Sequence, residues 1–174
     1  MIKKFLVVIF TVFFAFSAQA KTGFNIFAYS REAPEIKIFD NYGRAVQLSD
    51  FRGEFLIAVF WSKTCIPCLR EMRDLNEFAQ RVKDNGVRVI LISAEKEWAN
   101  PAAQLELINK YGGQGLDFYV DKGSALANEF GIFTSPHSVL IDSEGMEIGR
   151  IRGAVDWDDD TEEDIYKLKA QYRE

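Results

Sequence analysis

Two cysteines, Cys65 and Cys68, are separated by two residues and are the only cysteines in the 174-residue chain. This spacing brings two sulfur atoms within bonding range when the first cysteine opens a helix. The apolar run Phe55–Phe60 before them predicts a buried strand, and Pro67 suits the first turn of a helix. Cys65 would then lie at the positive helix end, which favours a thiolate. We therefore predict thiol-disulfide exchange, in which Cys65 attacks a substrate disulfide and Cys68 resolves the mixed disulfide.

Three other uses of the pair compete with redox exchange. A purely structural disulfide closing so small a ring would gain little entropy. A peroxide-reducing site would share Ser62, three residues before Cys65, but the proline typical of that motif is replaced here by Ala58. Zinc needs four ligands, whereas copper(I) tolerates fewer thiolates. A copper-binding carrier that uses the cysteine pair and His137, the single histidine, is therefore the alternative function.

A second signal lies at Ser135-Pro136, directly before a predicted strand. An X-Pro bond adopts the cis form at modest cost and then marks a tight turn. The proline has no N–H, so its neighbour Ser135 can offer backbone groups to an extended peptide. Together with the cysteines, Ser135 and Pro136 are predicted to bind substrate. His137 is either a turn residue or a cation near the thiolate, and Lys63 is either a second such cation or a solvated surface charge.

Residues 34–174 are expected to form one α/β domain. Alternation in Glu35–Phe39 and in Arg44–Leu48, on either side of a turn, predicts an N-terminal β-hairpin. Strands followed by helices and then by a second hairpin predict a mixed central sheet flanked by helices. The further strands are expected at 55–60, 87–93, 116–120, 138–142 and 146–152, and the helices at 67–83, 101–111, 124–130 and 160–172.

Residues 1–20 have the pattern of a secretory signal peptide. Lys3 and Lys4 precede an apolar run over 5–16, and Ser17–Ala20 offers a cleavage site. A membrane span needs ~20 apolar residues, so cleavage is favoured over an uncleaved anchor. Residues 21–33 show no period and are expected to be a loose lead-in. The mature protein should be exported, to a periplasm or an equivalent compartment where disulfides persist, with no membrane span after cleavage.

Composition excludes several classes of function. The chain has 26 acidic and 21 basic residues and a formal charge of −5, which argues against nucleic-acid binding. Acidic residues gather over 156–164, where they suit the start of a helix. A calcium site is the less favoured interpretation of this cluster, because the spacing of the carboxylates lacks an EF-hand pattern.

In combination these motifs resemble the thioredoxin superfamily, and in particular its exported TlpA/ResA-like branch of thiol-disulfide oxidoreductases. The resemblance covers roughly residues 34–153. It implies a thioredoxin-like fold, a nucleophilic Cys65, a resolving Cys68, a cis peptide at Ser135-Pro136 and Trp61 packed beside the site as a substrate-binding residue. No cofactor is implied. The stretches that carry it are Leu48–Gly53, Phe60-Trp61, Cys65–Cys68, Gly131–Asp142 and Gly145.

Two positions depart from the pattern of thioredoxin itself. Val59 stands where that protein has a buried aspartate, whereas Glu71 stands where the ResA-like branch has a glutamate, three residues after Cys68. Residues three apart share a helix face, so Glu71 is a candidate catalytic proton carrier for Cys68; the alternative is an ordinary surface charge. Thr64 replaces a tryptophan common in the family, which changes the surface that docks partners.

The residues between the cysteines bear on the direction of electron flow. Ile66-Pro67 supplies no charge that would stabilise a thiolate, and in this fold a less stable thiolate means a weaker oxidant. We therefore expect a reductant of protein thiol clients. The resemblance implies apocytochrome c as one such client. A reductant in an oxidising compartment also needs an electron donor, for which a membrane thiol reductase is expected.

Overall fold

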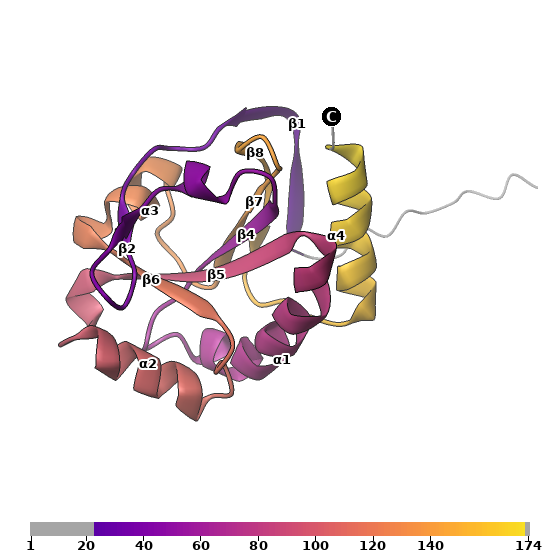
Figure 1. Ribbon diagram of the computed structural model, residues 1–174. Helices are drawn as coiled ribbons and strands as arrows, with labels where there is room; N and C mark the ends of the chain where they lie inside the picture. The colour runs from indigo at the N-terminus through magenta and orange to yellow at the C-terminus, as the bar shows by residue number, and fades with distance from the viewer. Residues whose placement is uncertain (1–22, 173–174) are drawn as a thin grey trace, which may run out of the picture.

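An eight-stranded mixed sheet forms the centre of the molecule in the computed structural model, which describes residues 23–172 (Figure 1). The strand order across the sheet is β1-β8-β7-β4-β5-β6-β2-β3. Parallel pairing joins β4, β5 and β6, whereas all other neighbours are antiparallel. The strands are β1 (Phe24–Glu32), β2 (Ile38–Phe39), β3 (Ala45–Val46), β4 (Phe55–Phe60), β5 (Val87–Ala94), β6 (Asp117–Asp121), β7 (His137–Ile141) and β8 (Met146–Arg152).

Strand β4 is buried along its whole length, as its uninterrupted apolar sequence predicts. It pairs in parallel with β5, where Ala58 faces Ile90, and antiparallel with β7, where Ala58 faces Val139. This central strand leads directly into the segment that carries the two cysteines, so a fully buried strand paired on both sides positions them.

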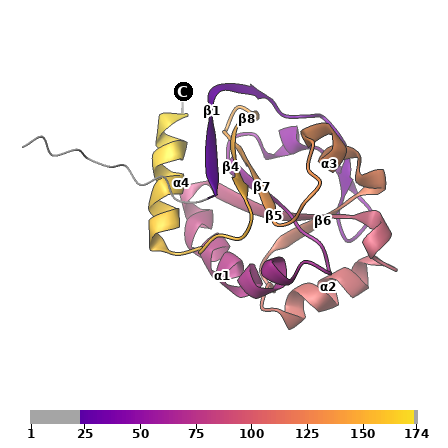
Figure 2. The ribbon, with the colours of Figure 1, turned by 180° about the vertical axis from the view of Figure 1, so that it is seen from behind.

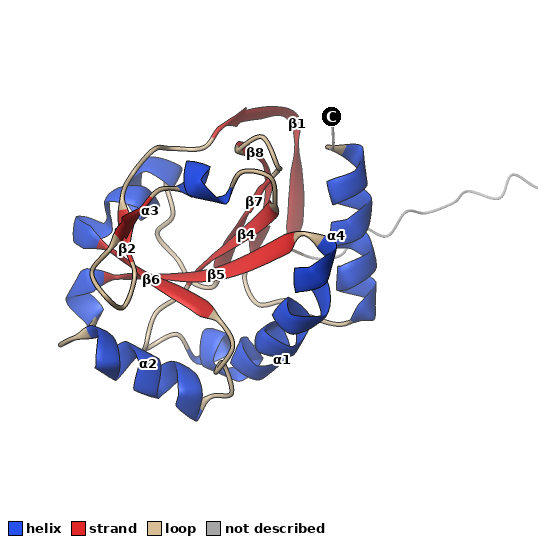
Figure 3. Ribbon diagram, viewed as in Figure 1, coloured by secondary structure: helices blue, strands red, loops and turns tan. Residues whose placement is uncertain are grey.

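Helices cover both faces of the sheet, as predicted (Figure 3). Helices α1 and α4 lie side by side in both views (Figures 1 and 2), and Arg81 of α1 pairs with Glu162 of α4 at 2.8 Å. The side chains of α1 and α4, together with Ile108 of α2, pack on one face, whereas α3 packs on the other. The helices are α1 (Ile66–Val82), α2 (Pro101–Lys110), α3 (Ala125–Phe130) and α4 (Asp159–Gln171).

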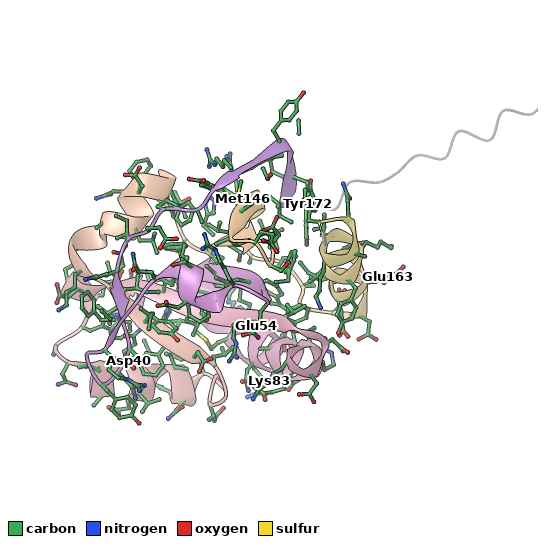
Figure 4. The ribbon with its side chains drawn as sticks, turned by 45° about the horizontal axis from the view of Figure 1, so that its top comes forward. Asp40, Glu54, Lys83, Met146, Glu163 and Tyr172 are labelled. Atoms are coloured by element: carbon green, nitrogen blue, oxygen red, sulfur yellow. A yellow bond between two sulfur atoms is a disulfide. The ribbon has the colours of Figure 1, made fainter. Side chains whose placement is uncertain are left out.

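Helix α1 buries the stripe that its sequence predicts. Leu75 and Phe78 are among its fully buried side chains, and the apolar spacing of about three to four residues keeps them on one face. Helix α4 has a face that is exposed to solvent. Glu163 on this face points away from the body of the molecule in Figure 4, and its carboxylate pairs with the Lys167 ammonium at 2.8 Å.

The predicted N-terminal hairpin is present but short. Strands β2 and β3 contain two residues each, and Phe39 of β2 pairs with Val120 of β6 at the edge of the sheet. The Asp40 carboxylate accepts the backbone N–H groups of Tyr42 and Arg44 at 2.9 and 2.8 Å, which fixes the turn (Figure 4).

The expectation of a loose lead-in over residues 21–33 needs a correction, because Phe24–Glu32 form β1. This strand pairs with β8 from Phe24↔Ile151 to Glu32↔Met146, with an irregular stretch between. It is an edge strand whose side chains are mostly exposed, so it lacks the alternation by which strands are recognised.

The predicted signal peptide, residues 1–20, lies outside the described residues. Over 23–172, no helix has both the length and the apolar character needed to cross a bilayer.

Candidate active site at the Cys65–Cys68 pair

Cys65 and Cys68 form a disulfide at the N-terminus of α1, with an S–S distance of 2.06 Å. Cys65 is the N-cap residue with extended backbone angles, and its Sγ accepts the backbone N–H of Cys68 at 3.2 Å. Pro67 lies in the first turn, where its missing N–H costs nothing. Cys65 therefore lies at the N-terminal end of α1, where the partial positive charge of the first-turn N–H groups would stabilise a thiolate.

The two sulfur-bearing side chains differ in exposure. Cys68 is only 2% exposed, whereas Cys65 is partly exposed and Ile66 beside it is 54% exposed. An incoming disulfide can therefore reach Cys65 but not Cys68. This asymmetry favours attack by Cys65 and leaves Cys68 to act from within the protein.

The segment before the cysteines is held by the loop that follows β5. Trp61 is buried and packs against Trp98 with ring centroids 5.3 Å apart. The Glu97 carboxylate accepts the backbone N–H of Lys63 at 2.8 Å, and the Lys63 ammonium donates to the Glu97 carbonyl and lies 5.9 Å from the Trp98 ring. The charge of Lys63 is thus engaged by this loop, as expected for a surface cation.

The Ser135-Pro136 bond is cis, as the resemblance implies. The Pro136 carbonyl accepts the N–H of Gly153 at 3.0 Å, which ties this turn to the end of β8. Ser135 and Trp61 line a common cleft of about 270 Å³, and Phe133 on its rim is 84% exposed. The structure therefore brings these two predicted substrate-binding residues to one cleft.

Glu71 is buried, with only 8% of its surface exposed, and this position excludes the surface-charge reading. Burial raises the pKa of Glu71 to about 7, and the Asp74 carboxylate adds to this effect. The Val155 N–H, which donates to Glu71 Oε2 at 3.3 Å, acts in the opposite sense. A pocket of about 390 Å³ is lined by both Glu71 and Pro67. A carboxyl group that titrates near neutral pH thus lies one helical turn from Cys68.

His137 requires a correction, because it does not face the cysteines. It pairs with Phe60 across β4 and β7, and Phe60 packs with Phe130 on the face of the sheet opposite Cys68. Burial, together with the nearby Arg150, lowers the pKa of His137 to about 4. His137 is therefore neutral at neutral pH and is not a cation beside the thiolate.

The copper-carrier alternative fails for the same reason. In the described part of the chain, no three side chains of histidine, cysteine, aspartate or glutamate gather in a way that would hold a metal ion. The alternation of side chains along β7 directs His137 to one face of the sheet, while the cysteines belong to the other.

Sequence reasoning missed four residues of the site: Glu97, Trp98, Val155 and Trp157. Each reaches the site from a segment distant in sequence, Val155 from 84 residues beyond Glu71. No local pattern marks such contacts. The only available signal was Trp157, an isolated aromatic residue within the acidic run, and it is 3% exposed.

Comparison with known proteins gives matches over most of the chain. The family model described as the AhpC/TSA family matches residues 29–147. The thiol-disulfide oxidoreductase ResA of Bacillus thuringiensis subsp. konkukian is 31% identical over 123 residues, which are 71% of this chain and 69% of that protein. ResA of Geobacillus thermodenitrificans is 28% identical over 138 residues, 79% of this chain and 74% of its own length.

Solved structures share the fold at lower identity. A thiol:disulfide interchange protein from Bacteroides sp. has a TM-score of 0.65 and 24% identity, covering 84% of this chain and 93% of that one. The pneumococcal exposed lipoprotein thioredoxin Etrx1 from Streptococcus pneumoniae has a TM-score of 0.62 and 23% identity, covering 78% of this chain and all of the other. Both comparisons identify the architecture as thioredoxin-like.

Proposed function

The chain belongs to the AhpC/TSA family and is a thiol-disulfide oxidoreductase with a thioredoxin-like fold, and from this premise we propose that it reduces disulfides of client proteins in an exported compartment. The Cys65–Cys68 pair supplies the electrons. The observation that carries this direction is electrostatic: neither Lys63 nor His137 is directed at Cys65.

The exchange runs in two steps. The Cys65 thiolate attacks one sulfur of the client disulfide, a mixed disulfide forms, and the other client sulfur leaves as a thiolate that takes up a proton. Cys68, once deprotonated, then attacks the Cys65 sulfur and releases the second client thiolate. Two electrons have passed to the client, and the protein is left with the disulfide between Cys65 and Cys68 that the structure contains.

Glu71 is proposed to take the proton of Cys68. Cys68 is buried, so water has poor access to its thiol. Glu71 follows three residues later on the same helix face, and its pKa of about 7 allows the carboxylate to accept a proton near neutral pH and to release it again. The pocket that Glu71 lines offers a route for that proton to solvent.

The client is proposed to bind at the cis-proline turn. Ser135 is exposed, and with Trp61, which precedes the cysteine segment, it lines one cleft. An extended client segment would pair with the Ser135 backbone, because Pro136 has no N–H that would compete. Apocytochrome c is the candidate client, as the ResA-like resemblance implies.

The place of action is proposed from the N-terminal sequence and from one structural neighbour. Residues 1–20 have the pattern of a secretory signal, and the pneumococcal neighbour is an exposed lipoprotein. In such an oxidising compartment the protein must be reduced again after each cycle. A membrane thiol reductase is the proposed electron donor.

The reduction potential tests the direction. The purified protein is equilibrated with glutathione buffers of graded composition, and the dithiol fraction is followed by tryptophan fluorescence, since Trp61 leads into the cysteine segment. We expect a potential near the value of about −270 mV known for thioredoxin.

A potential near about −120 mV, typical of strong periplasmic oxidants, would reverse the direction. The Cys65→Ser and Cys68→Ser variants serve as controls in the same buffers. Neither variant can form the internal disulfide, so neither should show the transition.

A further inference from the structure

The segment between β8 and α4, residues 153–158, is anchored to two different parts of the molecule. At its start, Gly153 donates to the Pro136 carbonyl at 3.0 Å. Near its end, the Trp157 carbonyl accepts a hydrogen bond from Arg81 Nη2 of α1 at 3.1 Å. Because both ends are fixed, the backbone between them has a defined position against α1.

The Val155 N–H is the first donor that this segment offers to Glu71. It reaches Glu71 Oε2 at 3.3 Å, which is long for an N–H···O bond. Val155 and Glu71 line the same pocket. A bond of this length has room to shorten when the acceptor gains a full negative charge, because hydrogen bonds to charged acceptors are shorter.

The Trp157 indole is the second donor. The ring is 3% exposed and packs on Phe78 with centroids 5.0 Å apart. Within residues 23–172 its Nε1 has no hydrogen-bond partner of normal geometry. A buried donor without a well-formed hydrogen bond is destabilising, and a closer approach of a charged acceptor would remove this cost. Trp157 lies close enough to Glu71 to help lower the pKa of that carboxyl group.

We propose that the Val155 N–H and the Trp157 indole N–H form a two-donor cradle that receives the Glu71 carboxylate when it is ionised, and that Trp157 is therefore a positioning residue for proton transfer to and from Cys68. This inference rests on the proton-carrier role proposed for Glu71. In the protonated state Glu71 needs only the Val155 contact. In the ionised state the indole supplies the second hydrogen bond.

Other charged groups also face Glu71. From α1, Asp74 opposes ionisation, and Arg70 lines the same pocket. From the connecting segment, Asp156 and Asp158 line that pocket as well. Burial and the Asp74 carboxylate make an ionised Glu71 less favourable, and the Val155 and Trp157 donors act in the opposite sense.

The test is an NMR titration of the full oxidised protein. The side-chain carboxyl carbon of Glu71 is followed from pH 4 to 10 in wild type and in Trp157→Phe, which keeps an aromatic ring against Phe78 but removes the N–H. We expect the Glu71 midpoint to move upward by about half a pH unit or more in the variant, as loss of one hydrogen bond to the charged form implies.

A matched control is Trp98→Phe. This variant also removes one indole N–H, but that N–H donates to Ser93 Oγ at 2.6 Å, away from Glu71. Its Glu71 midpoint should equal that of wild type. A shift as large as that of Trp157→Phe would show that the effect is not specific to the cradle and would overturn the proposal.

A second measurement needs no tryptophan substitution. In wild type, the Trp157 indole N–H resonance should titrate with the same midpoint as the Glu71 carboxyl carbon, and this titration should vanish in Glu71→Gln. An indole resonance that stays constant from pH 5 to 9 would refute the cradle. Failure of the proposed function is seen separately, as an unchanged pH profile of the resolving step in Glu71→Gln.

Discussion

At the level of single residues, Glu71 is the least expected feature of the site. Glutamate is rarely buried without a charged partner, and Glu71 is buried beside the Asp74 carboxylate with the Val155 N–H as a hydrogen-bond donor. The cost of this burial falls on the ionised form. The free energy of unfolding should therefore depend on whether Glu71 is protonated or ionised.

Glu71→Gln should abolish a pH-dependent loss of stability. The pKa of Glu71 rises from 4.5 to about 7 on folding, so between these values the folded state binds more protons than the unfolded state. The contribution of Glu71 to the free energy of unfolding should then fall as pH rises from 5 to 8, by on the order of 2 kcal/mol. Because the buried His137 contributes in the opposite sense, the effect of Glu71 is obtained from the difference between variant and wild type at each pH. The variant should lack this fall, as measured by urea denaturation of the oxidised protein.

The matched control is Glu77→Gln, which alters an exposed carboxylate on the same helix. Its stability should follow that of wild type at both pH values. Equal pH slopes in Glu71→Gln and wild type would contradict the buried, proton-holding environment of Glu71.

The placement of site residues could be predicted from sequence where the signal was local. Cys65, Pro67 and Glu71 follow one another on a single helix, so their spacing alone predicts their relation. Val155 and Trp157 reach Glu71 only through tertiary packing. The sequence contains no periodicity that would connect them to α1.

At the level of elements, the short helix α3 depends on a single carboxylate. Asp121, at the end of β6, is 1% exposed and accepts the N–H groups of Leu126 and Ala127 at 3.0 and 2.9 Å. These donors would otherwise be unsatisfied at the helix start. A helix of six residues has little stability of its own, so this bond pair fixes where α3 begins.

Asp121→Asn should therefore destabilise the protein. An amide offers one acceptor oxygen and turns an NH2 group towards the second donor, so we expect a loss of about 1–3 kcal/mol in the free energy of unfolding. Thermal or urea unfolding at pH 7 measures it.

Asp117→Asn, at the other end of the same strand, is the control. Asp117 forms an exposed ion pair with Arg88 at 3.1 Å, and such pairs contribute ~0–1 kcal/mol. If the two variants lost the same stability, the capping role of Asp121 would be wrong.

The accuracy of element prediction followed burial. Strand β4 and helix α1 have strong apolar patterns and were predicted within one or two residues. Strand β1 was missed because it is paired on one side only and has mostly exposed side chains. Edge strands are specified by their partner strand, which a local pattern does not contain.

At the level of the whole molecule, the two faces of the sheet contain buried titratable groups with opposite responses to pH. Glu71 lies on the α1 face, and its ionisation lowers the stability of the folded protein. His137 lies on the α3 face, and its protonation lowers the stability of the folded protein. The register between β4 and β7 decides the face on which His137 lies. That register could not be predicted from sequence, so the choice between a turn residue and a cation near the thiolate stayed open for His137.

His137→Gln should reduce the acid sensitivity of the fold. The pKa of His137 falls from 6.5 to about 4 on folding, so within this interval the unfolded state binds the additional proton. The contribution of His137 to the free energy of unfolding should therefore decrease from pH 7 to pH 5, by on the order of 2 kcal/mol. Glu71 contributes in the opposite sense, so the effect of His137 is obtained by comparing the variant with wild type at each pH.

The variant should show a smaller decrease, measured by urea denaturation at the two pH values. His137 is the only histidine, so no other imidazole contributes to the difference. Ser138→Ala, on the same strand, should retain the wild-type slope. An identical slope in His137→Gln would mean that the folded protein accepts the proton without penalty.

The hydrogen bond from Gly153 to the Pro136 carbonyl connects the proposed client-binding turn with the segment that reaches Glu71. Two residues after Gly153, the same stretch of backbone donates to Glu71. Substitutions that reshape the cis-proline turn for a new client protein are therefore expected to change the hydrogen bonding of Glu71, the proposed proton carrier. Such substitutions at this proposed client-binding turn should alter the pH dependence of exchange as well, and a variant library built on the turn should be screened at more than one pH.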